Sequence, residues 1–317
     1  MAYKFYFTCF LFYNLVFCQN YINPDVYGQD LLLFLENNYK TSSTLGYNNA
    51  RDIMYSDIDI KAGNQLTGVY SGYTITLDLS QDPSTDAYEK GINCEHTWPQ
   101  SLGSSSEPMK SDMHHLFPTK SNVNSSRGND PFDEIDDQLT DIWYRNDYSQ
   151  NNIPQQYINE YAEKYNPTNQ NNERFEPREE QKGNTARSMA YFYSIYLNVA
   201  DDQFWDIQKE VLFDWHYYDQ VDETELNRTL TIASYQDDIP NPFVIDPTLF
   251  WRSYFIEDYP VGDVNNDLDL NILDVVMIVD YVLENSDFTD LQIHQSDFSN
   301  DFNIDIIDII QIIEYLI

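Results

Sequence analysis

An internal repeat near the C-terminus restricts the fold of the last part of this chain. The segment GDVNNDLDLNILDVVMIVDYVL, which begins at Gly262, aligns with SDFSNDFNIDIIDIIQIIEYLI, which begins at Ser296. Four oxygen-bearing side chains coincide at a constant offset of 34 residues, and in both copies a polar loop runs directly into an apolar stretch. A repeat of this kind predicts one local unit used twice, here a loop followed by a helix.

The side chains of each copy fit a calcium-binding loop. Such a loop needs oxygen donors at positions 1, 3, 5, 9 and 12 and a backbone carbonyl at position 7, because Ca²⁺ takes several oxygen ligands. The first copy offers Asp263, Asn265, Asp267, Asp269, Asn271 and Asp274, and the second offers Asp297, Ser299, Asp301, Asn303, Asp305 and Asp308, with Asp269 and Asn303 at position 7. The alternative is an acidic face that is merely solvated. The spacing favours two Ca²⁺ sites.

This tail, residues 260–317, resembles a type I dockerin, a duplicated calcium loop and helix that binds cohesin modules. The resemblance implies a small all-α module with a cohesin-like protein as its partner. Leu268 and Phe302 stand at position 6, where dockerins carry glycine. From residue 261 onward the tail has thirteen Asp and Glu residues and no Lys or Arg, so its helices should depend on Ca²⁺ to hold the carboxylates together.

The N-terminus has the pattern of a secretory signal. Residues 1–18, MAYKFYFTCFLFYNLVFC, combine Lys4 with an apolar run that is short for a membrane span. Cys18 raises the alternative of a lipid-modified cysteine, but the residues before it fit that pattern poorly, which favours cleavage near Gln19. No later segment has 18 or more consecutive apolar residues. The mature protein is therefore expected to be extracellular or periplasmic, without a membrane span.

The body between these two ends shows mainly helical patterns with a small β element. Helical periodicity covers residues 25–39 and returns in residues 184–200 and 203–219. Residues 67–79 alternate as a strand or hairpin, with Gly72 at the turn. These patterns predict an α+β fold in which a mainly helical body precedes the all-α tail.

Three stretches of the body concentrate ionisable and amide side chains: CEHTWPQS at 94–101, DMHHLFP at 112–118 and VNSSRGNDPF at 123–132. Their order resembles the bacterial endonuclease I family of secreted nucleases, whose active site is a ββα-metal, or His-Me, finger. Further matches are YSG at 70–72, FEP at 175–177, KGNTAR at 182–187, WHYYDQVDETELNR at 215–228 and NPFVID at 241–246. The resemblance spans about residues 25–258 and implies a nuclease domain over residues 19–258.

The resemblance also implies how phosphodiester hydrolysis is divided among the residues. His96 is the general base that activates water, while Glu95 and Asn124 are the protein ligands of one catalytic Mg²⁺. Water and substrate would fill the remaining metal positions. Neighbouring side chains of a regular strand point to opposite faces, so Glu95 and His96 can share a site only at a strand end or a bulge.

Two arginines are candidates for holding phosphate. Arg127, three residues after Asn124, would lie on the same helix face and hold a phosphate oxygen, and the alternative for it is a salt bridge to an acidic residue. Arg187 is a weaker candidate. Family members place an arginine between the catalytic histidine and the Asp-x-His motif, but here that interval contains only Lys110 as a cation, so the role cannot be carried over.

The remaining polar residues of the three stretches are expected to support the site. Asp112, His114, His115 and Asn129 are assigned to orienting His96 or bracing the finger. Zinc held by His114 and His115 is the disfavoured alternative, because Asp112 is the only cysteine or acidic residue close to them in the sequence. The lone mature cysteine, Cys94, fits a small apolar filler better than a nucleophile.

The expected function is that of a secreted, Mg²⁺-dependent endonuclease acting on DNA, with RNA as a second candidate substrate. Sequence preference should be low, because phosphate contacts carry no base information. The net charge of −36 would repel such a substrate at a distance, but salt weakens that repulsion and only a local basic groove is required. The alternatives are a non-catalytic calcium-dependent binding module and a phosphodiesterase for other substrates.

Overall fold

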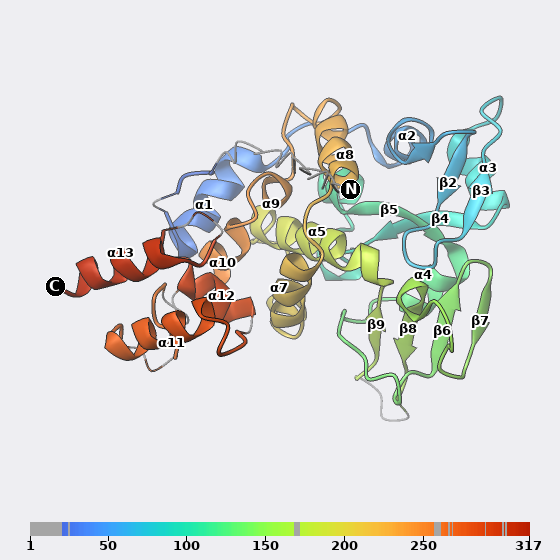
Figure 1. Cartoon of the computed structure of the whole chain (residues 1–317). Coiled ribbons are helices and arrows are strands. Elements are labelled where there is room, and N and C mark those ends of the chain that lie inside the picture. The colour runs from blue at the N-terminus through green and yellow to red at the C-terminus, as the bar shows by residue number, and fades with distance from the viewer. Residues whose placement is uncertain are drawn as a thin grey trace, which may run out of the picture.

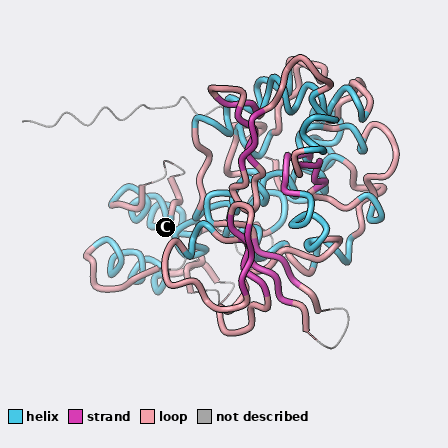
Figure 2. The backbone as a smooth tube through the Cα atoms, turned by 90° about the vertical axis from the view of Figure 1, so that its right-hand side faces the viewer, coloured by secondary structure: helices cyan, strands magenta, loops and turns pink. Residues whose placement is uncertain are grey.

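The computed structural model describes residues 21–24, 26–167, 172–256, 261–265, 267, 269–288, 290–299, 301 and 303–317. The expected signal, residues 1–18, lies outside the described residues, as do Leu268 and Phe302 of the tail loops. Figure 1 shows the strands gathered at one end of the molecule and most of the helices at the other, and Figure 2 looks onto the end that holds the strands.

Helix α5 (Lys182–Ile195) forms the centre of the body, and nearly all of its residues are buried. A helix enclosed on all sides needs neighbours on all sides, and these are α1 (Gly28–Tyr39), α7 (Lys209–Tyr218) and α9 (Pro242–Ile245), with α10 (Leu249–Tyr254) packed on α1 and α9. The remaining helices of the described body are α2 (Tyr47–Ile53), α3 (Pro83–Glu89), α4 (Ser121–Arg127), α6 (Asp202–Asp206) and α8 (Glu223–Ala233). The predicted helix at 25–39 is confirmed as α1, and the one predicted at 184–200 corresponds to α5, which ends earlier, at Ile195.

The predicted helical segment 203–219 is two helices, α6 and α7, and the side chain of Gln208 accounts for the break. Its amide nitrogen donates to the carbonyl oxygen of Phe204 at 2.6 Å, the acceptor that the backbone N–H of residue 208 would use in a continuous helix. Its amide oxygen accepts from the backbone N–H of Phe132 at 3.0 Å. Gln208 therefore ends one helix and ties this region to the loop after α4.

Three small antiparallel sheets carry the β structure. The first has the order β1 (Ile60–Lys61), β2 (Gln65–Thr67), β3 (Thr74–Thr76), with Gly72 at φ 72° in the predicted turn. The second pairs β4 (Ile92–His96) with β5 (Leu116–Lys120). The hairpin predicted at residues 67–79 is confirmed by β2 and β3, and the positive φ at its turn explains why residue 72 is a glycine.

The third sheet is a correction to the expected small β element. It has the order β7 (Tyr148–Gln150), β6 (Ile142–Arg145), β8 (Ala162–Tyr165), β9 (Arg174–Glu176). These strands have three or four residues each, too few for an alternating pattern to stand out. Charged side chains such as Glu163 and Lys164 are buried in them, which hides the usual contrast between an apolar and a polar face.

The tail contains the two predicted helices, α11 (Ile272–Val282) and α13 (Ile306–Leu316), and an unpredicted third helix, α12 (Asp290–Ser296). Val264, Val275, Ile278, Ile309 and Ile312 form its small core. Helix α12 faces the body, where the ring of His294 lies 3.6 Å from that of Tyr217 on α7, centroid to centroid. None of the helices among the described residues has the length and apolar character of a membrane span.

Candidate active site

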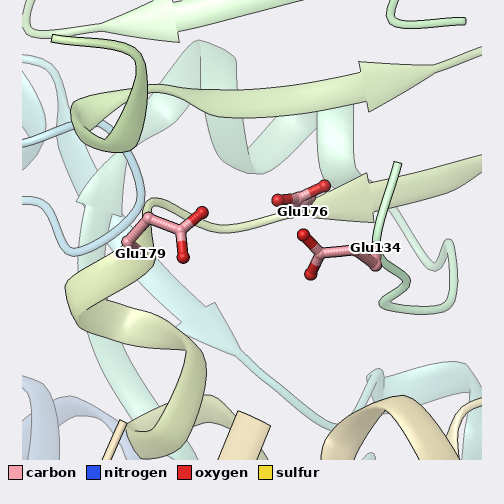
Figure 3. A group of neighbouring side chains, drawn as sticks. All are labelled: Glu134, Glu176 and Glu179. Atoms are coloured by element: carbon pink, nitrogen blue, oxygen red, sulfur yellow. The ribbon is translucent and has the colours of Figure 1, made fainter. Parts of the chain in front are cut away.

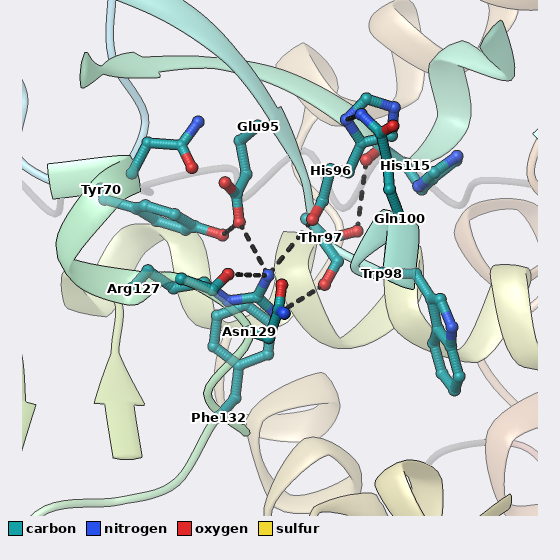
Figure 4. Close-up of polar contacts among 12 residues, drawn as sticks. Tyr70, Glu95, His96, Thr97, Trp98, Gln100, His115, Arg127, Asn129 and Phe132 are labelled. Atoms are coloured by element: carbon teal, nitrogen blue, oxygen red, sulfur yellow. Dashed lines mark hydrogen bonds and ion pairs between the residues drawn. The ribbon is translucent and has the colours of Figure 1, made fainter. Parts of the chain in front are cut away.

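The site is built on β4, β5 and the helix α4 that follows them directly. His96 is the last residue of β4 and pairs with Leu116, while Glu95 pairs with Phe117. The two side chains point in different directions from the strand, as expected for neighbours. Figure 4 shows Glu95 beside Tyr70 and Arg127, and His96 on the side of Gln100 and His115. At the strand end the two side chains have separate hydrogen-bond partners, while the guanidinium of Arg127 contacts both the Glu95 carboxylate and the His96 carbonyl oxygen.

The imidazole of His96 is held in one tautomer by a backbone carbonyl. Its Nε2 lies 3.0 Å from the carbonyl oxygen of Lys110, and because a carbonyl only accepts, Nε2 carries the proton. Nδ1 is then the lone-pair nitrogen, with the amide nitrogen of Gln100 donating to it at 3.4 Å. Burial, followed by the neighbouring His115, lowers the pKa of His96 to about 3. At neutral pH the ring is uncharged and Nδ1 can accept a proton.

The two other histidines of this region anchor the chain around His96. Nε2 of His115 donates to the carbonyl oxygen of Met109 at 2.5 Å, and its ring meets that of His96 edge-on at 5.4 Å. Nε2 of His114 donates to the carbonyl oxygen of Ile239 at 2.9 Å. The two rings have separate carbonyl partners, so they do not converge on a common position where a zinc ion would sit.

Glu95 is 1% exposed and lies against an arginine and a tyrosine. Its Oε1 accepts from the hydroxyl of Tyr70 at 2.9 Å and lies 3.3 Å from Nη1 of Arg127. Burial raises the pKa of Glu95 to about 7, and Arg127 and the hydroxyl of Tyr70 oppose that rise. Both contacts use the same oxygen. Within the described residues no hydrogen bond reaches Oε2.

Asn124 connects α4 to β4. Its amide nitrogen donates to the side-chain oxygen of Asn93 at 2.9 Å and to the carbonyl oxygen of Cys94 at 3.1 Å. No described residue donates to its Oδ1. Asn93 and Glu95 share a face of β4 because they are two residues apart, so Asn124 and Glu95 lie on the same side of the strand. Two oxygens without protein donors on one side of a strand suit a hard cation such as Mg²⁺.

Arg127 lies beneath the strand end and is 1% exposed. Its guanidinium donates to the carbonyl oxygens of His96 at 3.3 Å and Thr97 at 2.7 Å and packs over the ring of Phe132 at 4.6 Å. Together with the ion pair to Glu95, these contacts use Nη1 and Nη2, while Nε is buried without a hydrogen-bond partner among the described residues. The structure thus places Arg127 in the salt bridge that was its alternative role, where it braces the end of β4.

Arg187 is also fully buried. It donates to both carboxylate oxygens of Glu225, at 2.7 and 2.5 Å, and to the carbonyl oxygens of His216 and Asp219. With 0% of its surface exposed, it joins α5 to the segment from α7 to α8 and offers no face to a phosphate.

Asp112 and Asn129 lie in quite different surroundings. Asp112 is buried and accepts from the hydroxyls of Tyr191 and Tyr196, both at 2.7 Å, and from the amide of Gln236 at 2.8 Å. It fixes the start of the histidine segment to the core. Asn129 is exposed and donates to the hydroxyl of Ser101 at 3.0 Å, which holds the loop after α4 against the loop after β4.

Several site neighbours were not assigned a role from the sequence. Tyr70 belongs to the quoted YSG motif, which marked it without a function. Gln100 and Lys110 lie in the loop after β4, and Lys110 contributes through its backbone, which no side-chain pattern reveals. Tyr47 and Arg51 come from α2, and the ring of Tyr47 lies 5.4 Å from that of His96. Nothing in the sequence links α2 to this site.

Cys94 is half-buried, and desolvation raises the pKa of its thiol to about 12. A thiol that stays protonated at neutral pH is a poor nucleophile. These properties agree with the interpretation of Cys94 as filler.

Outside this site, three carboxylates approach one another closely (Figure 3). Glu134, Glu176 and Glu179 have oxygens within 4.8 Å of one another, the spacing of a metal site. Nζ of Lys182, however, lies 2.8 Å from an oxygen of each. The lysine ammonium thus already occupies the point where the three carboxylates converge and joins α5 to β9.

The two tail loops repeat the same hydrogen bonds. Asp267 N–H donates to Asp263 and Asp301 N–H to Asp297, at 3.2 and 3.0 Å. The buried carboxylates at position 12, Asp274 and Asp308, each accept backbone N–H groups from their own loop and cap α11 and α13. The pattern of the first copy is therefore reproduced in the second.

Comparison with known proteins agrees with the resemblance read from the motifs. The family described as Endonuclease I matches residues 28–248. An extracellular ribonuclease of Bacillus subtilis (strain 168) is 28% identical over 172 residues, which cover 49% of this chain and 51% of that protein. The chain thus spans about half the length of the curated relative it matches.

Proposed function

The chain belongs to the endonuclease I family, and from that membership we propose that it is a metal-dependent endonuclease that hydrolyses phosphodiester bonds of nucleic acids. The observation that carries the proposal is the orientation of His96 at the end of β4, where its Nε2 donates to the carbonyl oxygen of Lys110 and its Nδ1 carries the lone pair. Two oxygens without protein donors, from Glu95 and Asn124, lie on the same side of β4. The unit β4, β5 and α4 has the order of a His-Me finger.

In this proposal His96 takes a proton from the attacking water. Transfer to Nδ1 forms an imidazolium whose Nε2–H stays bonded to the carbonyl oxygen of Lys110, so the ring keeps its orientation during the step. Glu95 and Asn124 would hold Mg²⁺, which supplies charge neutralisation at the phosphate and the leaving oxygen when bound. Arg127 keeps Glu95 and the end of β4 in position.

DNA and RNA are both proposed substrates. The curated relative is named a ribonuclease, and contacts to phosphates alone would not distinguish the two nucleic acids. Cleavage should be tested on supercoiled plasmid and on single-stranded RNA, each with Mg²⁺ and with EDTA. EDTA is expected to abolish cleavage, and full activity in EDTA would contradict the metal dependence.

The same assay tests the proposed ligand on α4. Asn124→Ala is expected to raise the Mg²⁺ concentration for half-maximal rate by about tenfold or more, with partial rescue by excess metal, because one of only two protein ligands is lost. Asn122→Ala is the matched control, since Asn122 lies exposed on the same helix. Identical Mg²⁺ titrations for the two variants would remove Asn124 from the ligand set.

We propose further that residues 1–18 are a secretory signal, that the nuclease domain covers residues 19–258, and that residues 260–317 form a dockerin-like module that binds two Ca²⁺ and a cohesin-like protein. The two loops make equivalent hydrogen bonds, which supports the proposal that both bind the same kind of ion. The named homologue is extracellular, which agrees with secretion.

Calcium is expected to stabilise the tail in the full chain. Ligand at a hundred times its Kd stabilises the folded state by about 2.7 kcal/mol per site. The double variant Asp267→Asn, Asp301→Asn should weaken Ca²⁺ binding measured by calorimetry by about tenfold or more, because it removes a charged ligand from each loop. The control is Asp280→Asn, Asp287→Asn, which removes two exposed tail acids outside the loops. Equal binding by both variants would contradict the assignment.

A further inference from the structure

Very few cations of this acidic protein lack a carboxylate partner. The chain has 17 Lys and Arg residues against 53 Asp and Glu, so a cation without an ion pair is unusual here. Among the described residues, the cations with no carboxylate within ion-pair distance are Arg51, Lys61, Lys110 and Lys120. Arg51 lies on α2, Lys61 lies on β1, Lys110 lies in the short 3₁₀ helix at 109–111, and Lys120 is the last residue of β5. Of the four, Arg51 and Lys110 both lie against the ring of Tyr47, which is next to His96.

Two of these cations share one aromatic ring beside His96. The guanidinium of Arg51 lies 4.6 Å from the ring centroid of Tyr47, and Nζ of Lys110 lies 5.2 Å from the same centroid. The Tyr47 ring is 5.4 Å from the His96 ring. Contacts of this kind hold cations through the ring quadrupole without neutralising them. Both charges are therefore positioned close to the base while keeping their capacity to bind an anion.

The donors of Arg51 are largely unused. Its Nη2 donates to the side-chain oxygen of Asn48 at 2.9 Å, and its Nη1 makes no hydrogen bond to another described residue. Arg127 and Arg187, by contrast, are fully buried with their guanidinium groups bound to carboxylates and carbonyls. A phosphate can therefore reach the half-exposed pair of Arg51 and Lys110, but not the two arginines nominated from the sequence.

We propose that Arg51 and Lys110, positioned by the ring of Tyr47, bind a backbone phosphate of the nucleic-acid strand next to His96. This inference rests on the proposed nuclease function and identifies where the strand lies relative to the base. Guanidinium and ammonium donors form charge-assisted hydrogen bonds with phosphate oxygens. The pair supplies the local basic surface that a protein with a net charge of −36 needs to hold a polyanion.

The test separates strand binding from cleavage. The background is full-length His96→Ala protein, kept in EDTA so that no strand is cut. Binding of a fluorescent oligonucleotide is measured across a salt series for this protein and for the same protein carrying either Arg51→Gln or Lys110→Met as a second substitution. Each is expected to raise Kd by about tenfold and to reduce the slope of log Kd against log salt by about one, because one phosphate contact is lost. Arg51→Lys should retain most of the slope, since it keeps the charge.

Lys61→Met is the matched control. Lys61 also lacks an ion pair but is exposed on β1, so the same charge change should leave the salt slope nearly unaltered. Arg51→Gln and Lys110→Met variants that bind like Lys61→Met would overturn the proposal even if the enzyme cleaves nucleic acid normally. A wild-type chain that neither binds nor cuts nucleic acid would overturn the nuclease function and this inference together.

Discussion

Replacing His96 with alanine is expected to lower the rate of phosphodiester hydrolysis by about 10²- to 10⁴-fold, the usual contribution of a general base. The physical reason is the assignment of its nitrogens: Nε2 is committed to the carbonyl oxygen of Lys110, and Nδ1 is the proton acceptor. No other described imidazole is placed to replace it, because the nearest, His115, is bound to Met109. The measurement is kcat on plasmid and RNA at saturating Mg²⁺.

His96→Asn and His96→Gln together distinguish the base from a structural role. Asparagine is too short for its amide nitrogen to take the place of Nε2, so it removes both the proton acceptor and the hydrogen bond to Lys110, whereas the longer amide of His96→Gln can keep that hydrogen bond. Neither amide can take up a proton, so both rates should match that of His96→Ala. Unfolding midpoints of both variants should stay close to that of the wild type, which would show that lost activity is not lost folding. Activity within about threefold of wild type in either variant would exclude His96 as the base.

Replacing Arg187 with alanine is expected to destabilise the body by about 3–5 kcal/mol, a large part of the stability of an ordinary domain. The substitution leaves the carboxylate of Glu225, a residue that is 6% exposed, without its partner. It also removes the donor to the carbonyl oxygens of His216 and Asp219. Denaturant unfolding monitored by tryptophan fluorescence gives the free energy of unfolding.

Two comparisons check this explanation. Lys209→Ala breaks a surface pair with Asp206 at 3.9 Å and should cost less than about 1 kcal/mol. The double variant Arg187→Met, Glu225→Leu should recover part of the loss of Arg187→Ala, because no buried charge is left unpaired, while the freed carbonyl oxygens still carry a cost. A single variant as stable as the wild type would show that the buried pair contributes little.

The long periodic elements of this fold could be predicted from the sequence, and the short ones could not. Helix α1 and the helices α11 and α13 have apolar stripes that repeat over several turns, and the hairpin has a glycine where φ is positive. The strands β6 to β9 have no such signal. Their register depends on contacts with distant segments, such as the bridge between Phe132 and Phe175.

The candidate site was predictable as a set of motifs but not as a set of contacts. The motifs brought Glu95, His96 and Asn124 together on adjacent elements, as expected. They could not show that Arg127 points inward beneath the strand, because the sequence does not distinguish a buried arginine from an exposed one. The position of Arg51 was equally hidden, since the fold of the 44 residues between Arg51 and His96 decides that the ring of Tyr47, which Arg51 contacts, lies beside His96.

The atom that orients the proposed base belongs to the main chain. Because the carbonyl oxygen of Lys110 is present whichever residue occupies that position, substitution there leaves the tautomer of His96 intact. Such a substitution would change only the phosphate contact proposed for the Lys110 side chain. Substitutions at position 110 can therefore change the affinity for the nucleic-acid strand independently of the proton transfer to His96.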